Sequence, residues 1–185
     1  QARRPILYPG GGVINAGPRA SALLRELAAL TRAPVTSTLM GLGAFPASDP
    51  AWLGMVGMHG AYEANHAMHD CDVMVAIGAR FDDRVTGRLD TFAPPAKVVH
   101  ADIDPAEISK NRTADVPIVG DAREVLADLI VAVQADHEAG HKGDYTDWWK
   151  QINSWRDTYP LGYDQPADGS LSPQQVIERI GQLAQ

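Results

Sequence analysis

Several features that mark common classes of protein are scarce or missing in this sequence. Cys71 is the only cysteine among 185 residues, which excludes a disulfide framework and fits a reducing, cytoplasmic setting. We expect Cys71 to be a small buried apolar side chain. No apolar run approaches the ~20 residues of a membrane span, and we expect no signal peptide. Acidic residues outnumber basic ones, 23 to 16, and the basic ones form no stripe, so neither membrane nor nucleic acid is an expected partner.

The sequence does contain a regular alternation of strand and helix signals. Residues 39–57, rich in glycine and proline, indicate a long loop, which is often functional. Strands separated by helices favour right-handed crossovers and a mainly parallel sheet. The predicted fold class is therefore a three-layer, Rossmann-like α/β domain with five or six strands. The predicted strands are 5–8, 34–38, 73–77, 97–101 and 116–119, and the predicted helices are 18–30, 61–69 and 125–133.

Composition changes after the last of these helices. We expect the α/β domain to cover residues 1–134 and a linker to cover 135–171, with a possible tryptophan-containing helix at 144–158. Ser172 and Pro173 are typical of the cap and first position of a new helix, so that 172–185 reads as the start of another, truncated domain. Because its periodicity is poor, the segment 144–185 is expected to be less ordered than the core.

The most informative segment is the charged loop 78–88, Gly-Ala-Arg-Phe-Asp-Asp-Arg-Val-Thr-Gly-Arg. It follows the predicted strand 73–77 directly, and ligands of open α/β sheets bind at the carboxyl ends of strands. Arg80 and Arg84 suit an anionic ligand, because guanidinium groups bind phosphate in a two-pronged fork. The alternative interpretation is a solvated loop with internal ion pairs.

Other predicted strands also end in unusual loops. Gly10–Gly12 indicates a turn at which the backbone can approach a ligand, but it does not complete a dinucleotide fingerprint, because Asn15 stands at the third glycine position. Asp102 is placed to take ribose hydroxyls, and Asp104 either shares that role or caps a helix that begins at Pro105.

No self-contained catalytic centre is recognisable. The turn that contains His59 leads into a helix whose first amides suit a polar or anionic ligand group. The spacing of His59, His66 and His69 matches no zinc pattern well, and we expect no metal site. A Ser-His-Asp triad, a nucleophile elbow and a Walker loop are all missing from the sequence.

Taken together, these motifs resemble the central domain of the acetohydroxyacid synthase (acetolactate synthase) large subunit, a thiamine-diphosphate enzyme of branched-chain amino-acid synthesis. The resemblance covers residues 4–129 in order, with mild departures at Pro9 and Ala79, and the segment SPQQVIERI is similar to the entry to that family's C-terminal domain. The motifs that carry it are LYPGGG, PVTSTLMGLGAFP, LGMVGMHGAYEAN, VAIGARFDDRVTGRLDTFAP, VVHADIDPAEISKN and DVPIVGD.

The resemblance implies a DHS-like NAD/FAD-binding fold with FAD in this domain, in a mainly structural role. It also implies that Asp83 and Arg84 face the substrate channel. The implied FAD-binding residues are Gly11, Gly12, Thr38, Leu39, Met40, Met58, His59, Gly60, Gly78, Ala79, Arg80, Asp82, Arg84, Val85, Asp102, Ile103, Gly120 and Asp121.

For the whole enzyme, the resemblance implies condensation of two pyruvates to acetolactate, or of pyruvate with 2-ketobutyrate. Thiamine diphosphate and magnesium belong to N- and C-terminal domains outside this chain, so that the chain alone is expected to be inactive and to hold no catalytic residue. The expected partners are those two domains, further large subunits in a homo-oligomer and a regulatory small subunit. The alternatives are a related carboligase or decarboxylase, such as glyoxylate carboligase, and a non-catalytic nucleotide-binding module.

Overall fold

The alternating elements form one parallel sheet, which confirms the predicted fold class. The computed structural model describes residues 2–184, and within them the sheet has six strands in the order β3-β2-β1-β4-β5-β6, all neighbours parallel. This order places β1 and β4 side by side at the centre. The strands are β1 (Pro5–Pro9), β2 (Val35–Ser37), β3 (Trp52–Met55), β4 (Val73–Ile77), β5 (Lys97–Asp102) and β6 (Val116–Val119).

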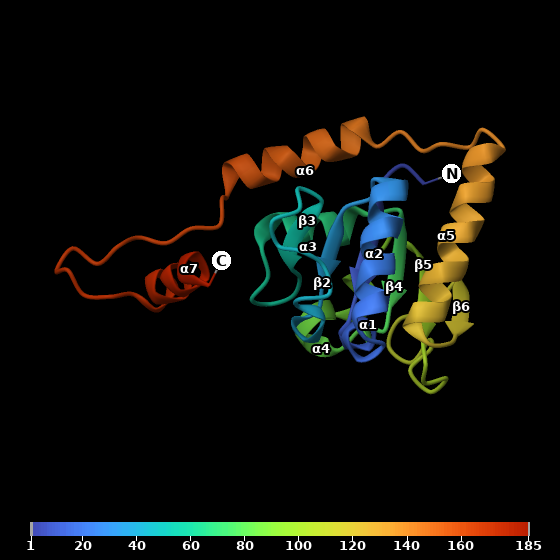
Figure 1. Ribbon diagram of the computed structural model, residues 1–185, viewed down its shortest axis with the longest axis horizontal. Helices are drawn as coiled ribbons and strands as arrows, with labels where there is room; N and C mark the ends of the chain where they lie inside the picture. Colours follow the sequence, from blue (N-terminus) through green and yellow to red (C-terminus); the bar gives the residue numbers. More distant parts are fainter. Residues whose placement is uncertain (1, 185) are drawn as a thin grey trace.

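Helices cover both faces of the sheet (Figure 1). Successive side chains of a strand point to opposite faces, so Leu7 packs in one buried cluster with α2 and α5, whereas Ile6 and Tyr8 pack in the other with α3 and α6. The helices are α1 (Gly11–Asn15), α2 (Pro18–Thr31), α3 (Tyr62–Asp70), α4 (Asp83–Thr86), α5 (Ala122–Glu138), α6 (Thr146–Thr158) and α7 (Pro173–Leu183), with 3₁₀ turns η1 (Leu39–Gly41) and η2 (Leu89–Thr91).

One strand lies inside the predicted loop 39–57, and for its four residues that prediction is wrong. Strand β3 pairs with β2, with Val35 opposite Trp52, and its pairing shifts in register before Met55. Gly54 has a φ of 88°, a conformation that glycine adopts at bulges. Gly54 accommodates the shift in register, and the same glycine made this segment resemble a loop in the sequence.

Helix α6 is the expected tryptophan-containing helix, and it packs into the core, which the sequence did not indicate. Trp148 is 3% exposed and Ile152 is fully buried. The indole Nε1 of Trp148 donates a hydrogen bond to the Pro5 carbonyl at 3.1 Å, and that of Trp149 donates to the Arg32 carbonyl at 2.9 Å. Helix α6 therefore crosses the amino ends of the strands, as Figure 1 shows.

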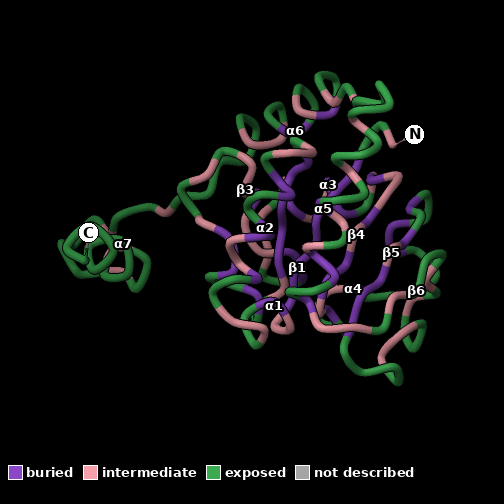
Figure 2. Tube along the Cα trace, turned by 45° about the vertical axis from the view of Figure 1, so that its right-hand side comes forward, coloured by how far each residue is buried: buried purple, intermediate pink, exposed green. Residues whose placement is uncertain are grey.

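The segment after α6 differs from it. Residues 159–172 are mostly exposed, and α7 lies apart from the sheet (Figure 2). The Ser172 hydroxyl caps α7, as predicted, by accepting a hydrogen bond from the Gln175 N–H at 3.2 Å. The apolar side chains of Ile177 and Ile180 on this helix are 71% and 60% exposed.

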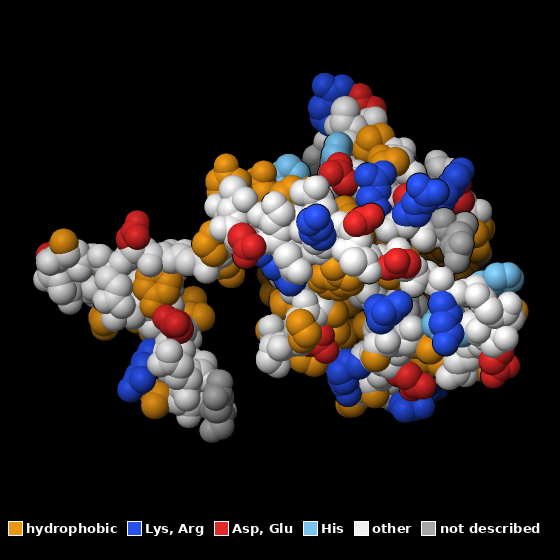
Figure 3. Space-filling model, turned by 90° about the horizontal axis from the view of Figure 1, so that it is seen from above, with side chains coloured by type: hydrophobic (Ala, Val, Ile, Leu, Met, Phe, Trp, Pro, Cys, Tyr) orange, Lys and Arg blue, Asp and Glu red, His pale blue; other side chains and the backbone are white. Residues whose placement is uncertain are grey.

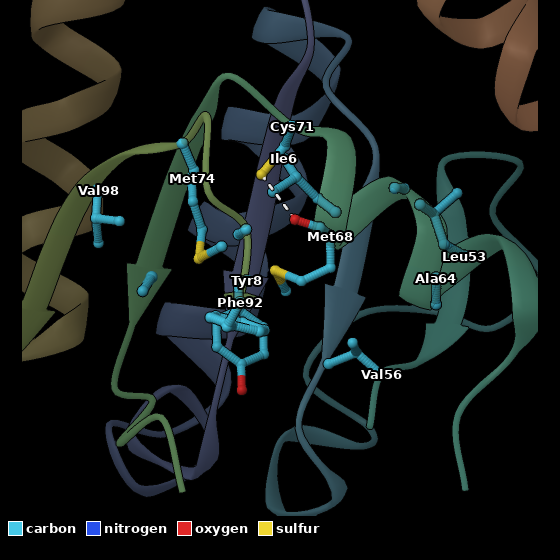
Figure 4. Packing of buried hydrophobic residues seen from close by; sticks show 14 of the residues in the cluster. Ile6, Tyr8, Leu53, Val56, Ala64, Met68, Cys71, Met74, Phe92 and Val98 are labelled. Atoms are coloured by element: carbon cyan, nitrogen blue, oxygen red, sulfur yellow. Dashed lines mark hydrogen bonds between the residues drawn. The ribbon is translucent and has the colours of Figure 1, made fainter. Parts of the chain in front are cut away.

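Cys71 is a buried apolar side chain, as the sequence indicated. Its thiol donates to the Met68 carbonyl at 3.1 Å (Figure 4), and burial raises the pKa of the thiol to about 12. Among residues 2–184, no helix combines the length and the apolar character that crossing a bilayer requires. Acidic and basic side chains are interspersed over the face that carries α6 (Figure 3).

Candidate functional site

A cleft opens at the carboxyl ends of the central strands. From β1 the chain turns to β2 and β3 on one side, whereas from β4 it leads to β5 and β6 on the other, and this switch point between β1 and β4 is where such sheets have their crevice. The cleft measures about 670 Å³, within the range of small-molecule sites. A larger hollow of about 870 Å³ runs along α6 at the other end of the strands and contains none of the predicted site residues.

Most of the site residues predicted from the sequence line the cleft, and they come from the ends of β1, β2, β4 and β5. Three further lining residues were missed: Asn15, Met55 and Val56. The predicted residues that line the cleft are Gly11, Gly12, Thr38, Leu39, Met40, Met58, His59, Gly78, Ala79, Arg80, Asp82, Arg84, Val85, Asp102 and Ile103.

Glycines bring two strand-end loops into direct backbone contact beneath the cleft. The Gly12 N–H donates to the Gly78 carbonyl at 3.1 Å. A Cβ on Gly12 would lie 2.6 Å from the Gly78 Cα, and a Cβ on Gly78, which has a φ of 59°, would lie 2.5 Å from the Gly12 Cα. The sequence suggested that Gly10–Gly12 allows close approach of a ligand. The structure shows a further reason for glycine at Gly10 and Gly12, which is the close approach of one loop to the other.

The charged loop presents its polar side chains to solvent and to the cleft. Arg80, Asp82 and Arg84 line the cleft, whereas Asp83 does not. The Asp82 side chain caps α4 by accepting from the Arg84 N–H at 3.2 Å. Arg84 and Asp83 form an ion pair at 3.6 Å, but both side chains are more than 70% exposed, so this pair contributes little. Among the described residues, the Arg80 guanidinium has no ion-pair partner.

One wall of the cleft is apolar although it faces solvent. Leu39, Met40 and Met58, which follow β2 and β3, are between 65% and 71% exposed and line the cleft. Ile103, which is 68% exposed, lines the cleft from the end of β5, beyond β1 and β4. Exposed apolar side chains gathered around a concave surface mark an interaction site. This wall suits a flat group with apolar faces, while the arginines suit an anionic group.

The acidic residues at the ends of β5 and β6 have different roles. Asp102 is 9% exposed and lines the cleft, and its Oδ1 accepts from the Asp104 N–H at 2.9 Å. Asp104 does not cap a helix, because residues 105–109 form turns; its Oδ1 accepts from the Ala106 N–H at 2.9 Å. Asp121 caps α5 instead, with its Oδ1 2.9 Å from the Arg123 nitrogen.

Four predicted site residues therefore lie outside the cleft, namely Gly60, Asp83, Gly120 and Asp121. Gly60 is tightly packed, since a Cβ there would lie 2.5 Å from the Met55 carbonyl oxygen. The histidines are dispersed: His59 lines the cleft, while His66 packs 4.2 Å from the Tyr62 ring, centroid to centroid. Within residues 2–184, no cluster of His, Cys, Asp and Glu side chains is arranged to hold a metal ion.

Another histidine, which the sequence did not single out, lies beneath the loop. His100 on β5 is fully buried, and its Nε2 is 2.8 Å from the Ala79 carbonyl oxygen. Because a carbonyl only accepts, Nε2 carries the proton. Burial lowers the pKa of His100, and it outweighs the opposing hydrogen bond to Ala79 and the charges of Asp102 and Glu107.

This lowered pKa predicts a pH dependence of stability. Below the ordinary His pKa of about 6.5, the unfolded chain binds more protons than the folded one, so the free energy of unfolding falls as the pH falls. Above that pH His100 adds no dependence. We expect the wild type to lose up to about 1.4 kcal/mol per pH unit more than His100→Gln in this window, measured by urea unfolding between pH 7.5 and pH 4.5. Parallel curves for the two proteins over that window would contradict the assignment.

The sequence of this chain is similar to those of known proteins. Over 183 residues, which is 99% of the chain, it is 56% identical to an acetolactate synthase of Mycobacterium avium. It is 47% identical over 182 residues to the acetolactate synthase isozyme 3 large subunit of Escherichia coli. The chain spans 29% and 31% of the length of these two relatives. Residues 1–129 match the family described as "Thiamine pyrophosphate enzyme, central domain". Because this match extends over more than half of the chain, the chain belongs to the thiamine pyrophosphate enzyme family and contains its central domain.

Proposed function

We propose that this chain is the central domain of an acetolactate synthase large subunit and that its cleft holds FAD. The observation that carries the proposal is the convergence of four strand ends on one cleft, lined by the residues of the motifs that resemble this enzyme. The whole protein would condense two pyruvates to acetolactate, or pyruvate and 2-ketobutyrate to acetohydroxybutyrate, in the cytoplasm. The names of the relatives favour this over a related carboligase.

The residues of the cleft fit the chemistry of FAD. The guanidinium groups of Arg80 and Arg84 suit the pyrophosphate, because charge-assisted hydrogen bonds to phosphate are strong. The carboxylate of Asp102, at the end of β5, suits ribose hydroxyls. The exposed apolar wall, with Leu39 and Met40, suits the faces of the isoalloxazine ring.

The remaining machinery lies outside this chain in the proposal. Thiamine diphosphate, held with magnesium by the N- and C-terminal domains of the same polypeptide, supplies the carbanion chemistry of ketoacid decarboxylation and addition. The role of this domain is to bind and orient FAD and to place Asp83 and Arg84 beside the substrate channel. Large subunits would assemble as homo-oligomers with a regulatory small subunit.

Removing either cleft arginine should weaken FAD binding by about ten- to a hundred-fold, because a hydrogen bond to a charged group contributes roughly 1.5–3 kcal/mol. Lysine at Arg80 or Arg84 should rescue only partly, because it keeps the charge and loses the planar fork. The measurement is titration of FAD into the full-length apoprotein that carries Arg80→Ala, Arg84→Ala or each lysine variant, followed by flavin fluorescence.

Arg88→Ala is the matched control for these variants. Arg88 belongs to the same loop but pairs with Asp90 through its Nη2 at 2.5 Å, and it does not line the cleft. FAD affinity should therefore stay at the wild-type value in Arg88→Ala. Alanine variants of Arg80 and Arg84 that fold and bind FAD as tightly as the wild type would leave the loop as a solvated ion-pair cluster.

Activity gives a second test of the proposal. The full-length protein should form acetolactate from pyruvate when thiamine diphosphate, magnesium and FAD are present. The 185-residue chain should form none under the same conditions, because the groups that hold thiamine diphosphate lie in other domains. Turnover by the purified chain would refute the domain assignment, whereas a colourless bound nucleotide in place of a flavin would favour a non-catalytic nucleotide-binding module.

A further inference from the structure

Phe81, at the centre of the charged loop, is anchored in the core between two side chains of the sheet. Tyr8 on β1, Ala76 on β4 and His100 on β5 occupy one row across three neighbouring strands. Residues in one row of a parallel sheet face the same side, and all three belong to the buried cluster on the α3 face or contact it. The small Ala76 leaves room between its two larger neighbours.

The ring of Phe81 lies over this row. Its centroid is 5.7 Å from that of Tyr8 and 5.0 Å from that of His100, edge-on to the imidazole, and Phe81 is only 2% exposed. Figure 4 shows the Tyr8 hydroxyl pointing along the sheet toward the carboxyl ends of the strands, where this loop begins. Aromatic contacts of this kind stabilise beyond the area they bury.

The backbone of Phe81 is turned so that its neighbours point the other way. Its φ is 53°, a conformation that is unfavourable for a bulky residue and persists only where its surroundings enforce it. Phe81 points into the core, whereas Arg80 and Asp82 are exposed and line the cleft. The anchored ring and the outward charges are two consequences of one backbone conformation.

Two side chains hold the carbonyls just before Phe81. His100 Nε2–H donates to the Ala79 carbonyl at 2.8 Å inside the core, and Asn111 Nδ2 donates to the Arg80 carbonyl at 3.1 Å. Among residues 2–184, His100 Nδ1 is buried without a hydrogen-bond partner, as is the Tyr8 hydroxyl. Such an atom costs stability, so an apolar residue would stabilise this position better unless the bond to Ala79 serves another purpose.

We infer that His100 and Phe81 are positioning residues, which hold the loop so that Arg80 and Asp82 face the cleft. His100 fixes the carbonyl that precedes Arg80, and Phe81 fixes the backbone that separates Arg80 from Asp82. Neither side chain lines the cleft. The consequence for ligand affinity rests on the proposed function, whereas the consequence for loop order does not.

Loop order can be tested without any ligand, by the rate of tryptic cleavage after Arg80 in the full-length apoprotein. His100→Leu removes the donor to Ala79 and keeps an apolar core, and we expect cleavage after Arg80 to accelerate about five- to ten-fold. Cleavage after Arg123, at the start of α5, should change less than two-fold. His100→Gln, whose amide can donate in place of Nε2, should restore the slow rate.

Leu24→Ala is the matched destabilised control, because Leu24 is fully buried on the other face of the sheet. It should accelerate cleavage after Arg80 and after Arg123 alike, because global opening exposes both. The same uniform acceleration in His100→Leu would reduce His100 to an ordinary core residue and overturn the inference. If His100→Leu does not fold, Phe81→Leu replaces it, with the same selective acceleration expected.

A double-mutant cycle on FAD affinity tests whether His100 acts through Arg80. We expect His100→Leu to weaken FAD binding about three- to ten-fold in the wild-type background and to have no effect in the Arg80→Ala background. Equal weakening in both backgrounds would overturn the inference for Arg80, as would wild-type affinity in His100→Leu while Arg80→Ala binds weakly. If Arg80→Ala itself binds FAD normally, the proposed FAD site fails, and the tryptic rates alone decide the inference about His100.

Discussion

Gly78→Ala should lower the free energy of unfolding of the 185-residue chain by about 2–5 kcal/mol, the sum of an unfavourable positive φ and a steric clash. The Cβ of the new alanine would lie 2.5 Å from the Gly12 Cα and 2.9 Å from the Gly12 nitrogen. Both contacts are with backbone, so no side-chain rotation relieves them. The measurement is urea unfolding followed by circular dichroism.

Gly87→Ala is the control without a clash, because Gly87 has a φ of 54°, close to the 59° of Gly78, and a Cβ there meets nothing within 4 Å. Its ψ is −125°, outside the left-handed helical region, so the alanine should cost only conformational strain, about 1–3 kcal/mol. The difference between the two variants isolates the contact between the loops after β1 and β4. Equal losses in the two variants would mean that the loops separate easily and that the floor of the cleft is not rigid.

Much of the fold could be predicted because several strands of the sheet are continuous apolar segments of ordinary strand length in the sequence. The runs at β4 and β6 are continuous apolar segments of strand length, and their observed bounds match the predicted ones. Strand β3 was missed because four residues that contain Gly54 carry no clear strand signal, and pairing with β2 decides their conformation. Helix α6 was expected, but its burial was not, because Trp148 packs against residues far away in the sequence.

The candidate site could be predicted at the level of loops but not of individual side chains. Parallel strands place their carboxyl ends at one edge, so residues after β1, β2, β4 and β5 had to come together. Whether a polar side chain faces the cleft depends on local bonds: Asp121 is used as a helix cap, whereas Asp102 faces the cleft. Asn15 was noted in the sequence only because it stands where a dinucleotide fingerprint would have its third glycine. His100 gave no signal, because its role depends on the register of β5 against β4.

The other large effect that we expect is at α6. Trp148→Ala should lower the free energy of unfolding by about 3–5 kcal/mol, the usual cost of truncating a large buried aromatic side chain. The variant loses the contacts of an indole that is 3% exposed and that lies 5.8 Å from the Trp155 ring, centroid to centroid. It also leaves the Pro5 carbonyl without the indole donor. Urea unfolding followed by circular dichroism measures this loss.

Trp149→Ala is the neighbouring control, with the same change of volume on a half-buried side chain. It loses one hydrogen bond, to the Arg32 carbonyl, and a cation–π contact with Arg156, and should cost about 1–2 kcal/mol. Limited proteolysis gives an independent measure of the same packing: wild-type α6 should resist cleavage while residues 159–171 are cut, and Trp148→Ala should lose that protection. If α6 is cut as fast as 159–171 in the wild type, the folded domain ends with α5 near residue 138. If α6 resists cleavage, it is the last element of the folded domain. The reason is that the indoles of Trp148 and Trp149 donate hydrogen bonds to the carbonyls of Pro5, at the start of β1, and of Arg32, just before β2.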